Sequence, residues 1–260
     1  MFEVRLSRIQ ALSDSTRDFQ FIREDGEHLD YVPGQFYRFV FEDLDGEFER
    51  SYSLCNFDEL YGDTLDLVIS KVEGGRATRL LFDCEEGLTA QVTGPFGRLV
   101  LPDENPGRLI MVATSVGLAP FMPMLKALET RDMNKVVLLL GVRDHTEFIY
   151  GDLLRQYAQA HDYFEVRFCI SREPPRAPDE CSGYVTEQLK ALDPVADTDH
   201  LLLCGNPAMI DDAWGYLKEK NFRPKKVVRE KYVFAREKKT AKALTEDQKK
   251  LIHEKMKKYS

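Results

Sequence analysis

Residues 109–128 read LIMVATSVGLAPFMPMLKAL. The first five form an uninterrupted apolar run that is typical of a buried strand, and residues 120–128 carry apolar side chains at helical spacing. The loop between them, residues 113–120, lies at the strand-to-helix position where α/β proteins bind dinucleotides. It lacks the G-x-G-x-x-G spacing, so the generic dinucleotide fingerprint is absent. This stretch predicts a parallel α/β sheet.

Strands and helices continue to alternate after this stretch. Apolar or β-branched runs predict strands, and apolar residues at helical spacing predict helices between them. This alternation indicates a doubly wound parallel sheet. The predicted strands are residues 136–142, 166–171, 201–203 and 226–234, and the predicted helices are residues 149–160, 185–192 and 207–220.

The first hundred residues have a different pattern. Short runs alternate at period two or are aromatic and β-branched, as at residues 2–6, 36–41 and 65–69, and residues 99–101 predict a closing strand. Gly, Asp and Pro separate these runs, which favours a small antiparallel barrel. The turn-rich residues 102–107 mark a boundary. We therefore predict a two-domain fold: an N-terminal antiparallel β-barrel over residues 1–103, an α/β parallel sheet over residues 107–235, and a basic helical tail over residues 236–260.

The composition is that of an ordinary globular protein, with 43% apolar and 31% charged residues among 260. The apolar runs are too short to cross a bilayer, and the first residues lack a signal-peptide pattern. The five cysteines are widely spaced without a C-x-x-C, and the five histidines are isolated. We expect no metal site, and thiols kept reduced as in the cytosol. We expect a cytoplasmic protein with no membrane insertion and no nucleic-acid partner.

One candidate binding cluster is Arg50-Ser51-Tyr52-Ser53. Alternation along a strand places Arg50 and Tyr52 on the same face. A planar guanidinium pairs well with phosphate, so the two side chains are suited to hold one phosphate and one ring of the same ligand. The alternative interpretation is an exposed strand edge.

A second cluster is Gly74-Gly75-Arg76-Ala77-Thr78. Paired glycines allow the backbone to approach a ligand closely, and the helix predicted at residues 77–82 presents its N-terminus to phosphate. The alternative is a plain Gly-Gly hairpin turn.

A further cluster, residues 204–209, reads CGNPAM, and alone it is equally typical of a capped helix start. In order and spacing, residues 50–53, 74–78, 113–120 and 204–209 resemble the motifs R-x-Y-S, G-G/K-x-x-S/T, G-T-G-x-G-x-A-P and C-G-N-P-x-M. These belong to the ferredoxin–NADP reductase superfamily, and the similarity is greatest to its bacterial ferredoxin or flavodoxin reductases. It spans about residues 1–235. Ala113 and Ser115 replace the first two glycines of the loop motif, which puts its phosphate contact in question.

The resemblance implies an FAD site. It implies Arg50 at the pyrophosphate, Tyr52 against the flavin ring, and Ser53 near the flavin N5, where hydride arrives. The strand after residue 67 would present its backbone to the flavin and ribose, and the helix start would hold the pyrophosphate. The implied FAD-binding residues are Arg50, Ser51, Tyr52, Ser53, Val68, Ile69, Ser70, Lys71, Gly75, Arg76, Ala77 and Thr78.

The resemblance also implies a site for the nicotinamide cofactor, formed by Thr114, Gly117, Cys204, Gly205 and Asn206. Glu230 and Tyr232 resemble a C-terminal Glu-x-aromatic pair whose aromatic ring covers the flavin. The implied catalytic residues are Ser53, Cys204 and Glu230. The alternatives are that Cys204 is a small buried hydrophobe and that the pair at 230 and 232 consists of ordinary edge-strand residues.

Two arginines bear on the choice of nicotinamide cofactor. Arg143 and Arg172 each follow a predicted strand of the second domain, and both match positions where NADPH-using relatives place arginine for the 2′-phosphate. Tyr184 stands where a further basic residue is expected, and its ring is suited to stack on adenine. We expect NADPH, with NADH possible. The alternative is that both arginines are ordinary surface residues.

The function that the resemblance implies is electron transfer from NADPH through FAD to ferredoxin or flavodoxin. A second interpretation is the NADH-dependent reductase component of an oxygenase, although the C-x₄-C-x₂-C motif of a fused cluster is absent. A third is a non-enzymatic subunit that binds a nucleotide or a partner.

The C-terminal segment differs in charge from the rest of the chain. Residues 223–260 hold fourteen Lys/Arg against five Asp/Glu, whereas the other residues hold 22 against 39. Thr245-Glu246-Asp247-Gln248 has the form of a capping box and predicts a helix there. This basic helix either packs on the acidic body or steers an acidic electron carrier toward the flavin.

Overall fold

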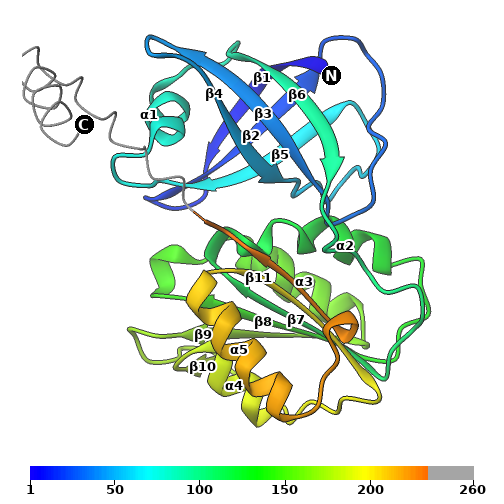
Figure 1. Ribbon diagram of the computed structural model, residues 1–260. Coiled ribbons are helices and arrows are strands. Elements are labelled where there is room, and N and C mark those ends of the chain that lie inside the picture. The colour runs from blue at the N-terminus through cyan, green and yellow to red at the C-terminus, as the bar shows by residue number, and fades with distance from the viewer. Residues whose placement is uncertain (234–260) are drawn as a thin grey trace, which may run out of the picture.

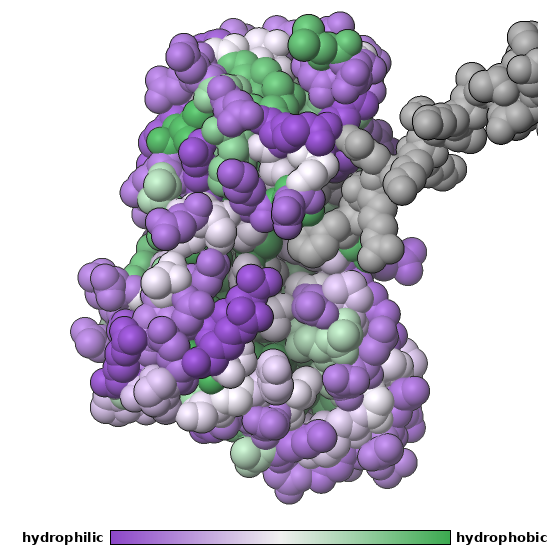
Figure 2. All heavy atoms as spheres, turned by 90° about the vertical axis from the view of Figure 1, so that its left-hand side faces the viewer, coloured by the Kyte–Doolittle hydropathy of each residue, from purple (hydrophilic) through white to green (hydrophobic). Residues whose placement is uncertain are grey.

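The computed structural model describes residues 1–233. Its two sheets lie in separate units, one above the other in Figure 1, and these units form two lobes that meet at a waist in Figure 2. The predicted tail, including the helix expected from Thr245, lies outside the described residues. Within residues 1–233, no helix is long and apolar enough to span a bilayer.

The N-terminal unit is a six-stranded antiparallel sheet that curls into an open barrel (Figure 1). Alternating side chains point inward and form an aromatic core that includes Phe19, Phe21, Phe39 and Phe41. In spatial order the strands are β4 (Gly46–Ser53), β3 (Phe36–Asp43), β6 (Thr89–Phe96), β1 (Phe2–Ala11), β2 (Thr16–Arg23) and β5 (Thr64–Ser70). One helix, α1 (Arg76–Asp83), packs against this core through Ala77 and Leu81.

The C-terminal unit is a six-stranded parallel sheet. Its spatial order is β10 (Glu180–Ser182), β9 (Phe164–Ile170), β8 (Val136–Val142), β7 (Arg108–Thr114), β11 (Asp199–Gly205) and β12 (Val227–Lys231). The helices are α2 (Phe121–Leu128), α3 (Gly151–Ala160), α4 (Val185–Ala191) and α5 (Pro207–Glu219), and the 3₁₀ turns are η1 (Ser115–Leu118), η2 (His145–Glu147) and η3 (Pro224–Lys226).

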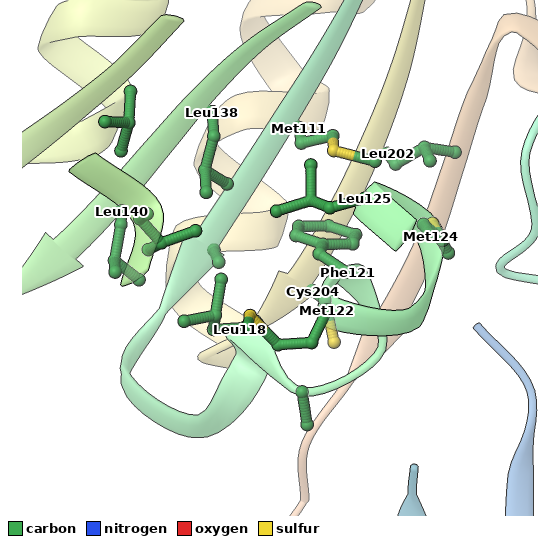
Figure 3. Packing of buried hydrophobic residues seen from close by; sticks show 14 of the residues in the cluster. Met111, Leu118, Phe121, Met122, Met124, Leu125, Leu138, Leu140, Leu202 and Cys204 are labelled. Carbon is green, nitrogen blue, oxygen red and sulfur yellow. The ribbon is translucent and has the colours of Figure 1, made fainter. Parts of the chain in front are cut away.

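The central strand β7 explains why both faces of this sheet are covered. Its alternate residues enter different cores: Met111 faces α2 and α3, whereas Ile110 and Val112 face α4 and α5. Figure 3 shows Met111 and Leu202 of the sheet beside Phe121 and Leu125 of α2. A strand buried on both faces needs a continuous apolar run, as residues 109–113 supply.

The predicted fold class is confirmed, and one predicted element is wrong. Residues 99–101 are not a strand. Leu99 and Leu101 are nevertheless buried, because their side chains pack into the core of the second unit rather than pairing in a ladder. The short edge strand β10 was not predicted, since three residues carry too little periodicity. The domain boundaries remain predictions.

Direct contacts join the two units. Cys55 and Val68 of the barrel belong to the same apolar core as the sheet residues beneath them. The Tyr150 hydroxyl, at the start of α3, donates to Asp18 Oδ2 of β2 at 2.6 Å. The barrel and the parallel sheet are therefore held together by apolar and polar contacts beside the cavities described next.

Candidate functional site

A cavity of about 430 Å³ lies between the barrel and the end of β12. It brings together residues that are far apart in the sequence and come from β4, β5, the start of α1 and the chain after β12. The predicted FAD-binding residues on its wall are Arg50, Ser51, Tyr52, Ser53, Val68, Ile69, Ser70, Gly75, Arg76, Ala77 and Thr78, joined by Glu230 and Tyr232. Lys71, also predicted, borders a neighbouring cavity instead.

The cluster at residues 50–53 lies on β4, an edge strand whose neighbour in the sheet is β3. Arg50 donates to its neighbour's carbonyl, Glu49 O, at 2.7 Å, and its guanidinium lies 5.2 Å from the Phe48 ring centre. The Tyr52 ring packs edge-on against Phe39. Burial raises the pKa of Tyr52, so this phenol stays neutral. The strand thus presents a cation and a neutral aromatic ring to one cavity.

The start of α1 is fixed by Thr78, whose hydroxyl donates to Val72 O at 2.8 Å and to Gly75 O at 3.0 Å. Gly74 has a φ of +71°, which favours glycine. The amides that open an α-helix lie outside its own i→i−4 ladder, and a helix start of this kind suits an anion. The backbone of this turn, rather than a side chain, is the feature suited to phosphate.

The Arg76 guanidinium has another partner. It donates to Asp43 Oδ2 at 2.9 Å and to Gly46 O at 2.7 Å, and the hydrogen bond to this arginine holds the pKa of Asp43 at about 2. The Arg76 side chain therefore links α1 to the turn between β3 and β4, and Arg76 also borders the cavity.

A chain of hydroxyl groups crosses between the two units at the cavity. The Tyr232 hydroxyl donates to Ser53 Oγ at 2.8 Å, and Ser53 Oγ donates to Glu230 Oε1 at 3.2 Å. Burial raises the pKa of Glu230, although the bond from Ser53 opposes the shift. Glu230 is thus a carboxyl group that can hold a proton beside Ser53.

A second cavity, of about 530 Å³, lies at the carboxyl ends of the parallel strands. This is the edge at which open α/β sheets bind their ligands. Thr114, Arg143, Gly205 and Asn206, all predicted, lie on its wall. The two cavities share Ser70, Val72, Val116 and Tyr232 on their linings.

Gly117 and Cys204 lie behind this wall rather than on it. A Cβ on Gly117 would come 2.5 Å from the Cys204 carbonyl oxygen, so only glycine lets η1 pack against the end of β11. Cys204 is fully buried among the apolar residues shown in Figure 3, and burial raises its pKa. Its strand register places it opposite Glu230. The structure therefore does not bring the Cys204 thiol to either cavity.

In the loop at residues 113–120, Ser115 stands at one of the two positions where another residue replaces a glycine of the motif. Ser115 adopts a φ of +50°, a region that favours glycine, which explains why glycine is the usual residue there. Thr114 Oγ1 accepts a hydrogen bond from the Asn206 amide at 2.9 Å and so joins this loop to the start of α5.

Arg143 and Arg172, the two arginines predicted to bind the 2′-phosphate of NADPH, differ in position. Arg143 is exposed and lines the second cavity, as does Tyr184. Arg172 does not line it, but its amide donates to Arg143 O at 2.8 Å, so the two residues are adjacent.

Sequence reasoning missed several wall residues. Phe36 and Ala119 border the first cavity, and Ser15 and Glu147 border the second. Ser15 Oγ donates to the Glu147 carboxylate at 3.0 Å across the two units. No local pattern marks these residues, because only the packing of the units brings them to the walls. Within residues 1–233, no group of three His, Cys, Asp or Glu side chains is arranged to hold a metal.

The donor set fits a flavin dinucleotide in the first cavity. A guanidinium and a helix start suit a pyrophosphate, two tyrosines suit a ring, and β5 lies along the wall. The second cavity offers Arg143, a helix start at Asn206 and an exposed aromatic ring, which suit a second nucleotide.

Comparisons with known proteins agree with this division. Residues 3–101 match the model of the oxidoreductase FAD-binding domain, and residues 111–214 match that of the oxidoreductase NAD-binding domain. Ferredoxin–NADP reductase B of Sorangium cellulosum is 29% identical over 219 residues, which cover 80% of this chain and 88% of that protein.

Two further relatives extend the comparison. The naphthalene 1,2-dioxygenase ferredoxin–NAD(P)(+) reductase component of Pseudomonas putida is 26% identical, over 78% of this chain but only 61% of that protein. A ferredoxin NADP+ reductase from Neisseria gonorrhoeae, solved with bound FAD and NADP, has the same fold. Its TM-score is 0.77 at 23% identity, covering 88% of this chain and 97% of that one.

Proposed function

Because the chain belongs to the ferredoxin–NADP reductase family of FAD- and NAD(P)-binding oxidoreductases, we propose that it oxidises NADPH and passes electrons to ferredoxin or flavodoxin. When bound, FAD accepts two electrons as a hydride and can release them one at a time, which a nicotinamide cannot easily do. The remaining task of the protein is to hold two cofactors and to position their reacting rings.

The observation that carries this proposal is the shared wall of the two cavities. Val116 and Tyr232 line both, so a flavin in the first and a nicotinamide in the second would meet beside them. Hydride transfer requires such close placement of the reacting atoms. The short segment after β12 and the loop at 113–120 thus have a positioning role.

Individual residues have distinct roles in this proposal. Arg50 and the amides of α1 bind the pyrophosphate, while Tyr52 orients the flavin ring. Glu230 accepts a hydrogen bond from Ser53 Oγ, and this bond connects its carboxyl to the flavin cavity. Cys204 lies on the neighbouring strand, in register with Glu230 and outside both cavity linings.

A second candidate function is favoured by the similarity to the naphthalene dioxygenase component. In that case NADH would be the donor and a ferredoxin of an oxygenase the acceptor. Arg143 on the wall of the second cavity supports NADPH instead, because a guanidinium recognises the additional 2′-phosphate.

Steady-state kinetics with each donor and each acceptor separate these functions. We expect the purified protein to be yellow, to prefer NADPH to NADH in kcat/KM, and to reduce ferredoxin or flavodoxin. A preference for NADH together with reduction of an oxygenase ferredoxin alone would support the second candidate. A colourless protein that binds no FAD would exclude both and indicate a non-enzymatic subunit.

A further inference from the structure

Two cysteines outside the proposed electron path face each other at the edge of the parallel sheet. Cys169 of β9 and Cys181 of β10 are register partners, and their Sγ atoms lie 3.6 Å apart. Cys169 is 1% exposed and lines the second cavity, whereas Cys181 is half-buried. One cysteine therefore borders the nucleotide cavity, and its partner is partly exposed to solvent.

The backbone geometry suits a covalent link. Neighbouring strands lie about 4.8 Å apart, and disulfides join Cα atoms that are about 4.4–6.8 Å apart. Directly paired residues of adjacent strands project to the same side of the sheet, so rotation of the side chains brings the sulfurs together. Strand β10 has three residues and lies at the sheet edge, so it can adjust.

The chemistry of the pair favours reaction at Cys181. The pKa of Cys181 is lowered, chiefly by its contact with the Cys169 sulfur, and the charge of Arg167 acts in the same direction while burial opposes the shift. The pKa of Cys169 is raised by this same contact and by burial. The thiolate is the nucleophilic form of cysteine, so the more accessible sulfur is also the more reactive one.

We propose that Cys169 and Cys181 are a redox-active pair that forms a reversible disulfide and thereby weakens nucleotide binding in the second cavity. The oxidant is a hydroperoxide. The Cys181 thiolate attacks the peroxide oxygen, the O–O bond breaks, and a sulfenic acid forms. The Cys169 sulfur then attacks the Cys181 sulfur, the S–O bond breaks and water leaves. For hydrogen peroxide, two thiols lose two electrons and two protons, and the peroxide becomes two waters.

The effect on binding follows from the position of Cys181 in the chain. It precedes Ser182, Gly183 and Tyr184, and the last two line the second cavity. The Gly183 amide donates to Ile170 O at 2.8 Å, so this segment already depends on β9 for its position. Closing the sulfur pair rotates the Cys181 side chain and constrains β10, and we infer that this moves Gly183 and Tyr184 at the cavity wall. This consequence for NADPH rests on the proposed function, whereas formation of the disulfide does not.

The test begins with the chemistry of the pair alone. The FAD-loaded protein is treated with hydrogen peroxide and digested without reduction, and its peptides are analysed by mass spectrometry. We expect a linked peptide containing Cys169 and Cys181, about 2 Da lighter than the sum of the two thiol peptides and cleaved by dithiothreitol. Cys181→Ser and Cys169→Ala should abolish it, while Cys84→Ser, which changes a half-buried cysteine in the barrel unit, should not.

The second measurement is the Kd for NADPH, determined by titration of the reduced and of the oxidised protein. We expect the Kd to rise about tenfold on oxidation, to recover with dithiothreitol, and to stay constant in Cys181→Ser. Absence of the linked peptide, or a linked peptide with an unchanged Kd, would overturn the proposal. If the linked peptide forms but the reduced protein binds no NADPH, the proposed function is refuted. The disulfide would then be confirmed, and the proposed effect of the disulfide on NADPH binding would be refuted.

Discussion

At the residue scale, the hydrogen-bond chain from Tyr232 through Ser53 to Glu230 connects the end of the second unit to the wall of the first. Ser53 has a single hydroxyl proton, which it donates to Glu230, and it accepts from Tyr232. The chain therefore has a direction, and a proton held by Glu230 is one hydroxyl away from Tyr232. Burial of Glu230 makes this arrangement sensitive to pH.

The first prediction concerns Glu230→Gln and stability. A carboxyl with a raised pKa contributes stability that is fully present below its unfolded-state pKa, about 4.3, and is lost as the pH rises through the folded-state value. The amide cannot ionise, so the variant escapes this loss. We expect urea unfolding to show the variant gaining stability relative to the natural protein as the pH rises from about 4.3 through the folded-state pKa of Glu230, with no further gain above it. A difference that is constant with pH would contradict the burial of this carboxyl.

Arg50→Ala tests the placement of the pyrophosphate. Loss of one partner of a desolvated charge pair costs about 2–4 kcal/mol, so FAD affinity should fall by that amount. The measurement is FAD binding by fluorescence titration of apoprotein. Arg5→Ala is a matched control, because Arg5 pairs with Glu24 away from both cavities. Full FAD retention by Arg50→Ala would show that the pyrophosphate lies elsewhere.

Arg143→Ala and Arg172→Ala test the cofactor choice. A charged hydrogen bond to the 2′-phosphate contributes about 1.5–3 kcal/mol, so kcat/KM for NADPH should fall accordingly while that for NADH stays nearly constant. Arg143 should have the larger effect, since it lines the cavity and Arg172 does not. Arg176→Ala, which removes a partner of Glu173 in the following loop, is the control. Equal losses with both cofactors would refute a 2′-phosphate contact.

At the scale of elements, strand β2 and the start of α3 are joined by Asp18 and Tyr150. Asp18 is 6% exposed, and burial raises its pKa against the opposing effects of the Tyr150 hydrogen bond and of Arg8. Tyr150 has a φ of +55°, so its backbone adopts a region that few residues other than glycine occupy. The contact therefore holds a strained residue at the junction of the two units.

Tyr150→Phe should reveal the strength of this junction. It removes the donor and leaves a buried carboxylate with one partner fewer, at a cost of about 1–3 kcal/mol. The loss in the free energy of unfolding would be measured by urea denaturation, monitored by flavin fluorescence and by circular dichroism. We expect FAD affinity to change little, because Tyr150 lies outside the first cavity. A variant as stable as the natural protein would mean that water replaces the hydroxyl.

Some of these elements could be predicted from the sequence, and others could not. The apolar run at residues 109–113 and the glycines at 74 and 75 are local signals, and they placed β7 and the start of α1 well. Leu99 and Leu101 gave a strand signal, but their burial comes from the other unit. Arg172 and Cys204 matched motif positions, yet their distance from the cavity wall depends on packing that no motif encodes. The bond between Tyr232 and Ser53 spans 179 positions and has no local signal.

At the scale of the whole molecule, function depends on how the barrel and the parallel sheet meet. Residues of both units line each of the two cavities, and the cavities share Ser70, Val72, Val116 and Tyr232. Three contacts fix the relative position of the two units. They are the apolar core that includes Val68 and Leu118, the Ser15–Glu147 hydrogen bond and the Tyr150–Asp18 hydrogen bond. Neither unit alone contains a complete path from one nucleotide to the other.

Anaerobic rapid mixing would show whether the shared wall brings the two cofactors together. The FAD-loaded protein is mixed with NADPH, and then with oxidised ferredoxin or flavodoxin, while the flavin absorbance is recorded. We predict rapid bleaching of the flavin band on the first mixing and its recovery, with reduction of the carrier protein, on the second. A flavin that stays oxidised with both NADPH and NADH would contradict the proposed function, because the shared wall would then not bring the two cofactors together.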